Sequence, residues 1–434
     1  MSPFEMTRRA FSQLGIGALA WSAVSRSRVL GANDRIRLGF IGVGNRGSQL
    51  LDAFLKHEDM EVVVLCDVYE PYLDRAQQKL PRKADTTIDF RKVLDRNDVD
   101  GVVIATPDHW HAIQTIWACR AGKDVYVEKP LSITVVEGRK MVEAARKYQR
   151  IVQVGTHRRS SRLYAQLYEL VHSGKIGKVT VSRAYRLSNM YPKGIGKAAP
   201  SAPPPGLHWD LWLGPRPERP FQETIAPYKF RWWHLYSSQM ANWGVHYLDA
   251  IRWLTDELAP SSVCAMGGNF AVDDDRTIPD TMEAVFQFAS GRLAIFGQYE
   301  ASGAPALAQG ELELRGTLGA AYIGGRVFEI IPERGGQFQD PRPRLEPIRV
   351  EVPAGENDMT VDHARNFLDC MRSRQLPNAD VEIGHRSTTC SLIANISLAV
   401  GARLEWDAEK ERFTNNEEAN QMLHYEYRKP WSLD

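Results

Sequence analysis

Two side chains in this sequence, Lys129 and His246, could carry acid–base chemistry. Lys129 stands between Glu128 and Pro130, directly after the short apolar run 124–127, which reads as a buried strand. Because the side chains of an extended segment alternate between its faces, Glu128 and Lys129 point apart. One of them can face a cofactor while the other faces a hydroxyl group, from which the lysine could take a proton. The alternative is a solvated lysine at the end of a strand.

His246 shares one face of a predicted helix with three other side chains, because these residues are spaced by four, three and four positions: Asn242, His246, Asp249 and Trp253. A polar stripe of this kind suggests a helix with one edge lining a cleft. Imidazole titrates near neutrality, so His246 is the second acid–base candidate. The alternative is a buried structural histidine paired with Asp249.

A glycine-rich turn follows the apolar run 36–41, with the spacing Gly42-x-Gly44-x-x-Gly47, and leads into a helical segment at 48–57. In this spacing the first glycine permits a tight turn and the second lets a pyrophosphate approach bare backbone. The third lets the helix pack closely on the strand. We therefore predict a dinucleotide site that also includes Asn45 and Arg46.

Asp67 closes a second apolar run, 61–66, about 20 residues beyond the last glycine, where a ribose-binding acid is expected. Its carboxylate can accept the ribose 2′-hydroxyl and would repel a 2′-phosphate, which favours NAD over NADP as the cofactor. Arg46 is near enough to weaken this preference. The alternative is a loop aspartate after a core strand.

The first third of the chain alternates strands and helices, the pattern of a doubly wound parallel sheet. The predicted strands are 36–41, 61–66, 101–105, 124–127 and 151–154, and the helices between them include 72–80, 111–121 and 135–148. Ligands of such sheets bind beyond the carboxyl ends of the strands. The polar residues at two of those ends are therefore placed on the cofactor side: Thr106, Pro107, His109, His111, Glu128, Lys129 and Pro130.

After residue 155 short alternating segments predict a second, open sheet that is mostly antiparallel. Its predicted strands are 179–185, 262–269, 281–288, 292–298, 310–315 and 320–323, with packing helices at 238–254, 360–374 and 384–404. The predicted fold class is α/β, with a Rossmann NAD-binding domain at 35–155. A second, α+β domain is predicted at 156–434.

The charge balance excludes some classes of partner. Lys plus Arg number 54 against 53 for Asp plus Glu, a net charge of +1, which suggests neither a nucleic-acid nor an acidic-membrane partner. The five cysteines show no metal-binding spacing, and most lie in apolar segments typical of buried free thiols. We predict no metal site.

The segment 1–34 is predicted to lie outside the fold. Arg8 and Arg9 precede a small apolar run, 14–24, that is too short to span a bilayer. This pattern resembles a bacterial twin-arginine export signal, which predicts a periplasmic protein without a membrane-spanning segment in its mature form. The alternative is a chance Arg-Arg pair before an amphipathic helix.

Together these motifs resemble the glucose–fructose oxidoreductase/inositol dehydrogenase (Gfo/Idh/MocA) family. The residues that carry the resemblance are Gly42-x-Gly44-x-x-Gly47, Asp67, Thr106-Pro107-x-x-x-His111, Glu128-Lys129-Pro130 and Gly244-x-His246-x-x-Asp249. The resemblance covers the chain after residue 34. It implies NAD or NADP in the first domain, and a sugar site and an oligomer interface on the open sheet. The tryptophan-rich block and the closing segment 427–431 look like an exported bacterial branch.

The predicted substrate side consists of Arg158, Trp232, Asn242 and Asp249. Arg158 lies where relatives place substrate-side residues, Trp232 belongs to the tryptophan-rich block, and Asn242 and Asp249 lie on the polar helix face. Many relatives have aspartate where this chain has Asn242, and an amide can orient a partner but cannot accept a proton. Lys129 is therefore the preferred base. The tryptophans at 209, 212, 232 and 233 could stack on sugar rings or could simply pack in the core, and the sequence leaves both open.

The expected function is that of an NAD-dependent oxidoreductase acting on a ring hydroxyl of a sugar, glycoside or polyol, with a tightly held cofactor. The first alternative is an NAD-dependent glycosidase, which oxidises a sugar transiently, eliminates the aglycone and returns the hydride. The second is a cofactor-bound protein without turnover, against which the presence of both Lys129 and His246 counts.

Overall fold

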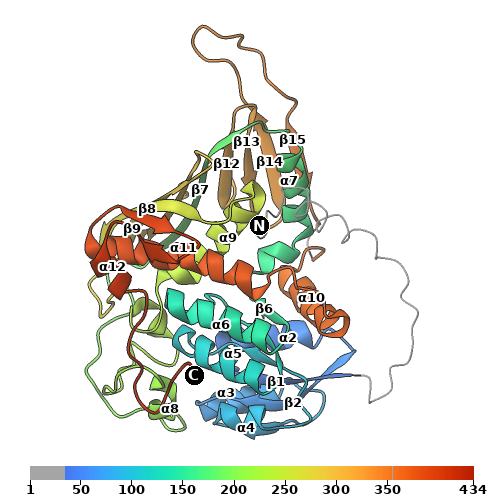
Figure 1. Ribbon diagram of the computed structural model, residues 1–434, viewed down its shortest axis with the longest axis vertical. Coiled ribbons are helices and arrows are strands. Elements are labelled where there is room, and N and C mark those ends of the chain that lie inside the picture. The colour runs from blue at the N-terminus through green and yellow to red at the C-terminus, as the bar shows by residue number, and fades with distance from the viewer. Residues whose placement is uncertain (1–34, 354) are drawn as a thin grey trace, which may run out of the picture. The chain divides into compact units, whose positions relative to one another are not determined.

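A computed structural model describes residues 35–353 and 355–434, so the predicted export signal at 1–34 lies outside the described residues. A first sheet has six parallel strands in the order β3-β2-β1-β4-β5-β6 (Figure 1). The strands are β1 Ile36–Ile41, β2 Met60–Cys66, β3 Asp85–Thr87, β4 Gly101–Ile104, β5 Asp124–Val127 and β6 Val152–Val154. The predicted parallel sheet is confirmed. Strand β3 was not predicted, because its three polar residues carry no apolar pattern.

Helices cover both faces of this sheet, as a doubly wound fold requires. The helices α2 Asn45–Phe54, α3 Glu70–Gln77 and α10 Met359–Ser373 pack on one face, and α4 Phe90–Leu94, α5 His111–Arg120 and α6 Val135–Lys147 pack on the other. Figure 1 shows α10 beside α2, although more than 300 residues separate them in the chain. Phe54 of α2 meets Phe367 of α10 and Tyr126 of β5 edge to face.

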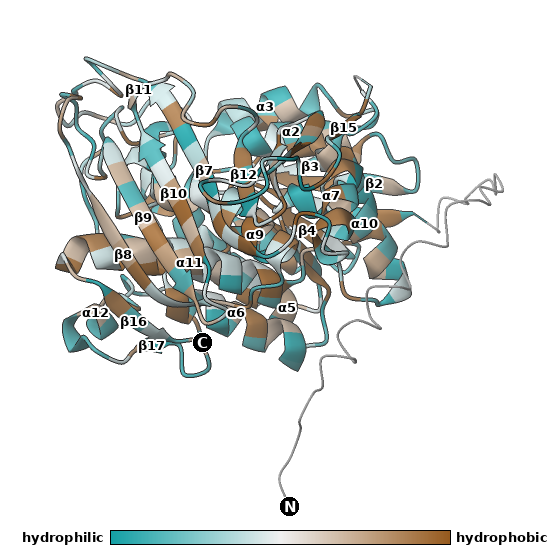
Figure 2. Cartoon of the chain, turned by 90° about the horizontal axis from the view of Figure 1, so that it is seen from above, coloured by the Kyte–Doolittle hydropathy of each residue, from teal (hydrophilic) through white to brown (hydrophobic). Residues whose placement is uncertain are grey.

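The second sheet has eleven strands, of which only the β7–β10 pair is parallel. Its strands are β7 Val179–Asn189, β8 Pro260–Gly268, β9 Thr281–Phe288, β10 Leu293–Tyr299, β11 Ala301–Ser302, β12 Leu312–Gly316, β13 Gly319–Ile323, β14 Val327–Pro332, β15 Ile348–Glu351, β16 Leu404–Asp407 and β17 Arg412–Phe413. Figure 2 shows alternating hydropathy along β8, β9 and β10, and burial on β9 alternates in the same way. The predicted open, mostly antiparallel sheet is confirmed.

The long helix α11 Val381–Val400 is buried on almost every side, since it packs against α6 and β6 and also against β8 of the second sheet. It therefore joins the two sheets. The helices α7 Arg162–His172 and α9 Val245–Thr255 also pack in the core of the second sheet. The predicted helix at 238–254 is confirmed, but it begins with a π-helical turn, Met240–Gly244.

Shorter elements complete the described chain: the helices α8 Trp209–Leu213 and α12 Glu417–Gln421, and the 3₁₀ turns Asp108–Trp110, His157–Ser160 and Lys229–Trp232. Residues 36–434 form one compact unit, and the domain boundary at 155/156 stays a prediction. No helix in the described ranges is long and apolar enough to cross a membrane. The cysteines are free thiols, and Cys264 alone among them is exposed.

The packing of α10 on the first sheet predicts a large stability effect at Phe367, whose side chain is fully buried. Phe367→Ala should lower the free energy of unfolding by about 3–5 kcal/mol, because removal of the ring leaves a cavity between the rings of Phe54 and Tyr126. The matched control is Phe338→Ala, since Phe338 is 92% exposed, and it should change stability by less than about 0.5 kcal/mol. Urea unfolding measures both, and equal effects would show that α10 is not docked here.

Candidate functional site

The glycine-rich turn lies at the carboxyl end of β1 and leads into α2. Gly42 has a φ of +84°, and a Cβ at Gly47 would lie 2.0 Å from the carbonyl oxygen of Gly42. The first glycine therefore makes the turn and the third allows close packing, as predicted. A Cβ at Gly44 would lie 2.7 Å from the ring of Tyr72. Bare backbone at the N-terminus of α2, which starts with Asn45 and Arg46, fits the phosphates of a dinucleotide.

Asp67 follows β2 and lines a pocket at the same edge of the sheet. Its carboxylate accepts hydrogen bonds from the backbone N–H of Val43 at 2.8 Å and of Tyr69 at 2.9 Å. Withdrawal from water raises the pKa of Asp67 to about 6, although these hydrogen bonds oppose the shift. Asp67 thus holds the glycine turn in place and still presents an acceptor to a ribose.

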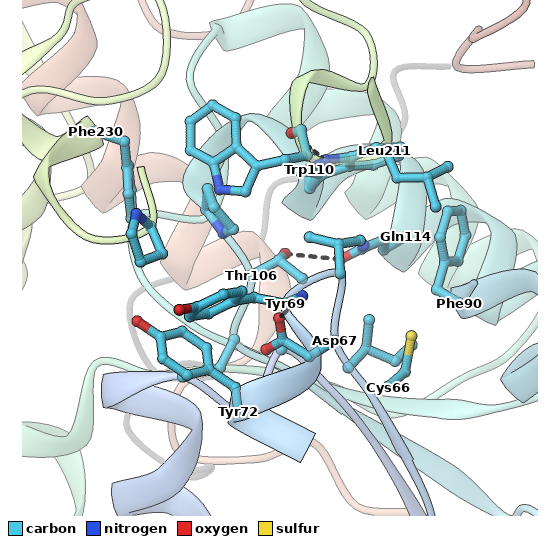
Figure 3. Close-up of a pocket in the computed structure, with 18 of the residues that line it drawn as sticks. Cys66, Asp67, Tyr69, Tyr72, Phe90, Thr106, Trp110, Gln114, Leu211 and Phe230 are labelled. Carbon is cyan, nitrogen blue, oxygen red and sulfur yellow. Dashed lines mark hydrogen bonds between the residues drawn. The ribbon is translucent and has the colours of Figure 1, made fainter. Parts of the chain in front are cut away.

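Aromatic side chains enclose the rest of this pocket, and Figure 3 shows Asp67 beside Tyr69 and Tyr72 among them. They come from three distant parts of the chain and were not predicted as cofactor contacts: Tyr69, Tyr72, Phe90, Trp110, Trp212, Tyr228, Phe230 and Trp431. Trp431 packs edge-on against Trp110, with the ring centroids 4.7 Å apart. Flat apolar walls beside a carboxylate and a glycine turn fit the adenosine part of a dinucleotide.

Of the polar residues after β4, only some reach the pocket. Thr106 and Pro107 line it, and the Thr106 hydroxyl donates to Gln114 Oε1 at 2.8 Å. His109 is instead buried between Trp212 and Tyr236, and its Nε2 lies 2.9 Å from the Trp212 carbonyl. Burial lowers the pKa of His109 to about 3, so it is a neutral packing residue at pH 7. His109 is therefore not among the residues that line the pocket, where its cofactor contact was expected.

His111 links the two polar strand ends. One ring nitrogen lies 2.7 Å from the carbonyl oxygen of Pro130 and the other lies 3.0 Å from that of Thr106. The peptide bond between Lys129 and Pro130 is cis. His111 thus positions the Glu-Lys-Pro element and is not part of the pocket lining.

Glu128 and Lys129 point apart, as predicted. Glu128 accepts a hydrogen bond from Arg46 Nε at 2.7 Å, which joins the lysine strand to the first turn of α2. Lys129 instead donates to the backbone oxygen of Asn242 at 2.9 Å and to its Oδ1 at 2.6 Å. Withdrawal from water lowers the pKa of Lys129 to about 8, with Glu128 and Asp108 opposing this and Arg231 adding to it.

His246 lies on the same side as Lys129 and stacks on His157, with ring centroids 5.1 Å apart. Burial and the nearby Lys129 and Arg158 hold the pKa of His246 well below its usual range, so the ring is neutral at pH 7. Its Nδ1 has no hydrogen-bond partner among the described residues. His157, which the sequence did not single out, is a second neutral imidazole beside the site.

Asp249 is not free to contact a substrate. Its fully buried carboxylate pairs with Arg159 Nε at 2.8 Å and accepts a hydrogen bond from Ser387 at 2.6 Å. The alternative pairing of His246 with Asp249 is also not seen, because Arg159 takes this position. The sequence could not show this, since Ser387 is 138 residues away.

The other predicted substrate-side residues have internal partners too. Arg158 is buried and pairs with Glu311 at 2.8 Å, and Trp232 donates from Nε1 to Glu300 at 2.9 Å. Trp212 and Trp233 are buried in an aromatic core, which favours packing for these two tryptophans. Asn242 alone of the predicted substrate-side set contacts the lysine directly. Within the described residues, no cluster of three or more histidine, cysteine or acidic groups could hold a metal.

The first sheet carries the glycine turn and Asp67, the expected ribose-binding acid, and Lys129 extends from it to Asn242. This combination is typical of dinucleotide-binding oxidoreductases with two sheets. The chain belongs to the Gfo/Idh/MocA oxidoreductase family. Residues 36–156 match its NAD-binding Rossmann fold, and residues 164–433 match its C-terminal alpha/beta domain. The predicted family is confirmed.

Solved structures share the fold. Levoglucosan dehydrogenase, in complex with NADH and levoglucosan, superposes with a TM-score of 0.65 at 18% identity, over 86% of this chain and 99% of that one. An oxidoreductase domain protein from Kribbella flavida gives a TM-score of 0.66 at 21% identity, over 86% and 99% of the two chains.

The matching curated sequences include the alpha-N-acetylgalactosaminidase of Shewanella oneidensis, which is 33% identical over 152 residues, 33% of each chain. A glycosyl hydrolase family 109 protein of Shewanella baltica is also 33% identical, over 154 residues and 34% of each chain. The chain thus spans about a third of the length of the curated relatives it matches.

The hydrogen bonds of Asp67 predict how the dinucleotide site responds to its loss. Asp67→Ala should weaken NAD⁺ binding by about 10- to 100-fold, because it removes a charged acceptor, and should weaken NADP⁺ less, because it also removes a repulsion. The matched control is Asp52→Ala, since Asp52 is exposed on α2. Calorimetric titration of the wild type and both variants with each nucleotide measures the six affinities, and a wild type that already prefers NADP⁺ would contradict the role given to Asp67.

Proposed function

We propose that this protein is an NAD-dependent oxidoreductase that acts on a ring hydroxyl of a sugar, glycoside or polyol. The observation that carries the proposal is the Lys129 amine, which lies between the glycine turn and the second sheet with a pKa of about 8. A general base is most effective when its pKa lies near the working pH. NAD is the proposed cofactor rather than NADP, because Asp67 would repel a 2′-phosphate.

Bound NAD⁺ would supply the hydride acceptor. The residues that would hold it are those whose fit is described above: the three glycines, Asp67 and the aromatic walls. The chain's own chemistry begins at Lys129. With two N–H groups donated to Asn242, a neutral amine keeps its lone pair for a third direction. There it would take the hydroxyl proton while the C–H bond breaks and a carbonyl forms.

The neutral His246 would orient a neighbouring hydroxyl of the substrate. Its unpaired Nδ1 and its position beside Lys129 support this role, and its low pKa excludes a charged imidazolium at pH 7. Lys129 is therefore the base and His246 an uncharged hydrogen-bonding group.

We also propose that the cofactor is held through the whole catalytic cycle. Three separate parts of the chain close its pocket: the first sheet, the segment around Leu211 to Arg231, and Trp431. Such retention suits a protein exported by the twin-arginine route into a periplasm, where no soluble dehydrogenase pool recycles NADH. A retained cofactor must be restored in each cycle, so either a second, oxidised substrate would take the hydride back, or the same sugar would do so after elimination. The overall reaction would then be redox-neutral.

The second candidate is a redox-neutral glycosidase that eliminates an aglycone beside a transient ketone. The matches to family 109 glycosyl hydrolases favour it, although they cover only a third of the chain. A non-catalytic binding protein would have no need of Lys129 at this pKa. Purified protein should be incubated with free sugars and aryl glycosides while NADH absorbance and aglycone release are both followed. Turnover of neither class would contradict the proposed function.

We further propose that the protein forms a homo-oligomer through the open sheet. The outer face of the sheet supports this, since Met266 on β8 is 76% exposed there.

The pKa of Lys129 predicts the pH dependence of sugar oxidation. Because the base must be unprotonated, kcat/KM should rise about tenfold per pH unit below pH 8 and level off above it. Lys129→Met should lower the rate of the chemical step at least about 100-fold and leave NAD⁺ binding nearly intact. Lys140→Met, at an exposed position on α6, is the matched control. Near-normal turnover by Lys129→Met would exclude the lysine as the base.

The closed pocket predicts that cofactor copurifies with the protein. Extensively dialysed wild type should release about one NAD(H) per chain on denaturation, whereas Trp431→Ala should retain less than about half of that. Leu433→Ala, in the same tail but outside the pocket lining, should behave like wild type. Low occupancy of the wild type, with steady turnover only when NAD⁺ is added, would reject tight retention.

A further inference from the structure

A chain of hydrogen bonds runs from a buried ion pair to the amine of Lys129. Glu300, just after β10, accepts from Arg276 Nη1 at 2.6 Å and from Gln239 Nε2 at 3.0 Å. Gln239 Oε1 accepts from Asn242 Nδ2 at 3.3 Å, and Asn242 Oδ1 accepts from Lys129 Nζ at 2.6 Å. Glu300, Gln239 and Asn242 are all buried, so water does not compete for these groups.

The direction of every bond in this chain is set at Glu300. A carboxylate can only accept, so Gln239 must turn its nitrogen to Glu300 and its oxygen to Asn242. The Asn242 amide must then donate to Gln239 and present its oxygen to Lys129. Trp232 Nε1 also donates to Glu300, at 2.9 Å, and Arg276 pairs with Asp274 as well, at 2.9 Å. These donors fix the carboxylate.

We propose that Glu300 and Gln239 are positioning residues, which hold the Asn242 amide so that its oxygen, and not its nitrogen, faces the amine of Lys129. The inference rests on the proposed role of Lys129 as the base. An oxygen accepts an N–H of the amine and so aims its lone pair at the substrate, whereas a flipped amide would place donor against donor. A carboxylate far from the lysine thus acts on it through two amides, without adding a charge beside it.

Other groups act on Lys129 directly and stay unchanged in the test. They are Glu128 on its own strand end, Asp108 after β4, Arg46 on α2, Arg231 in the turn 229–232, and the neutral rings of His157 and His246.

The chain predicts a pattern of loss and rescue. Glu300→Gln removes the fixed acceptor, so Asn242 can flip, and we expect about a tenfold lower rate of hydride transfer with little change in KM. The titration midpoint of Lys129 should fall by about 0.5 pH units or more, because an oxygen acceptor favours the ammonium form. Asn242→Asp alone leaves Gln239 between two carboxylates and should also lower the rate.

The double variant Glu300→Gln/Asn242→Asp should recover function, because the hydrogen bonds of Gln239 can then run in the opposite direction. Its nitrogen donates to the carboxylate at 242, and its oxygen accepts from the amide nitrogen at 300. Its plateau rate should return to within about threefold of wild type. Its Lys129 midpoint should rise by about one unit, since a carboxylate beside an ammonium group favours the charged form. A purely structural role for Glu300 would not produce this rescue.

Competitive acylation of the full-length protein by limiting acetic anhydride, followed by peptide mass spectrometry, gives the Lys129 midpoint without turnover. Gln239→Met, which breaks the chain without changing charge, should match Glu300→Gln and serves if that variant does not fold. Glu313→Gln is the matched control, since Glu313 is a buried carboxylate of β12 paired with Arg183. It should leave the midpoint unchanged.

The inference is overturned if Gln239→Met and Glu300→Gln leave the midpoint within about 0.2 units of wild type. It is also overturned if the double variant is no better than the worse single variant. Predicted shifts in labelling, without turnover of any sugar or glycoside, would support the positioning chain and reject the proposed function.

Discussion

The site depends on one constraint: an amine largely withdrawn from water must keep its N–H groups satisfied and still be able to lose a proton. Lys129 follows β5, and its amine satisfies two N–H groups by donating to Asn242 in the π-helical turn before α9. Helix α11 packs on elements of both sheets and on this π-helical turn. Its neighbour Glu128 faces the other way, towards Arg46 and the glycine turn. Two consecutive residues therefore connect the cofactor side with the substrate side.

Sequence predicted the elements that carry dense local signals. The first sheet follows from apolar runs separated by helices, and the glycine spacing places the cofactor turn. Strands β11 and β14 to β17 were missed. Strands β11 and β17 have only two residues each, β15 and β16 alternate apolar with charged residues, and β3 is polar. The packing of α10 beside α2 could not be predicted. The helical periodicity of α10 shows that it has an apolar face, but not which element that face contacts.

The candidate site divides in the same way. Alternation along a strand correctly separated Glu128 from Lys129, and helical spacing correctly brought Asn242 and His246 to the lysine's side. The expectations for His109 and Asp249 did not match their surroundings, because their partners, Trp212 and Arg159, are remote in sequence. The contact between Glu300 and Gln239 could not be predicted for the same reason, because these residues are 61 positions apart in the sequence. Periodicity identifies a face, but only the folded chain identifies what that face meets.

The place of Trp431 in the cofactor pocket has a consequence for biosynthesis. This residue follows both sheets in chain order, yet it forms a wall of a pocket built mainly by the first sheet. Residues 36–156 contain the glycine turn and Asp67, but not the wall that Trp431 adds to the pocket. The ribosome must therefore finish nearly all of the described chain before a dinucleotide can be enclosed. Closure of this pocket is therefore tied to synthesis of the chain as far as residue 431.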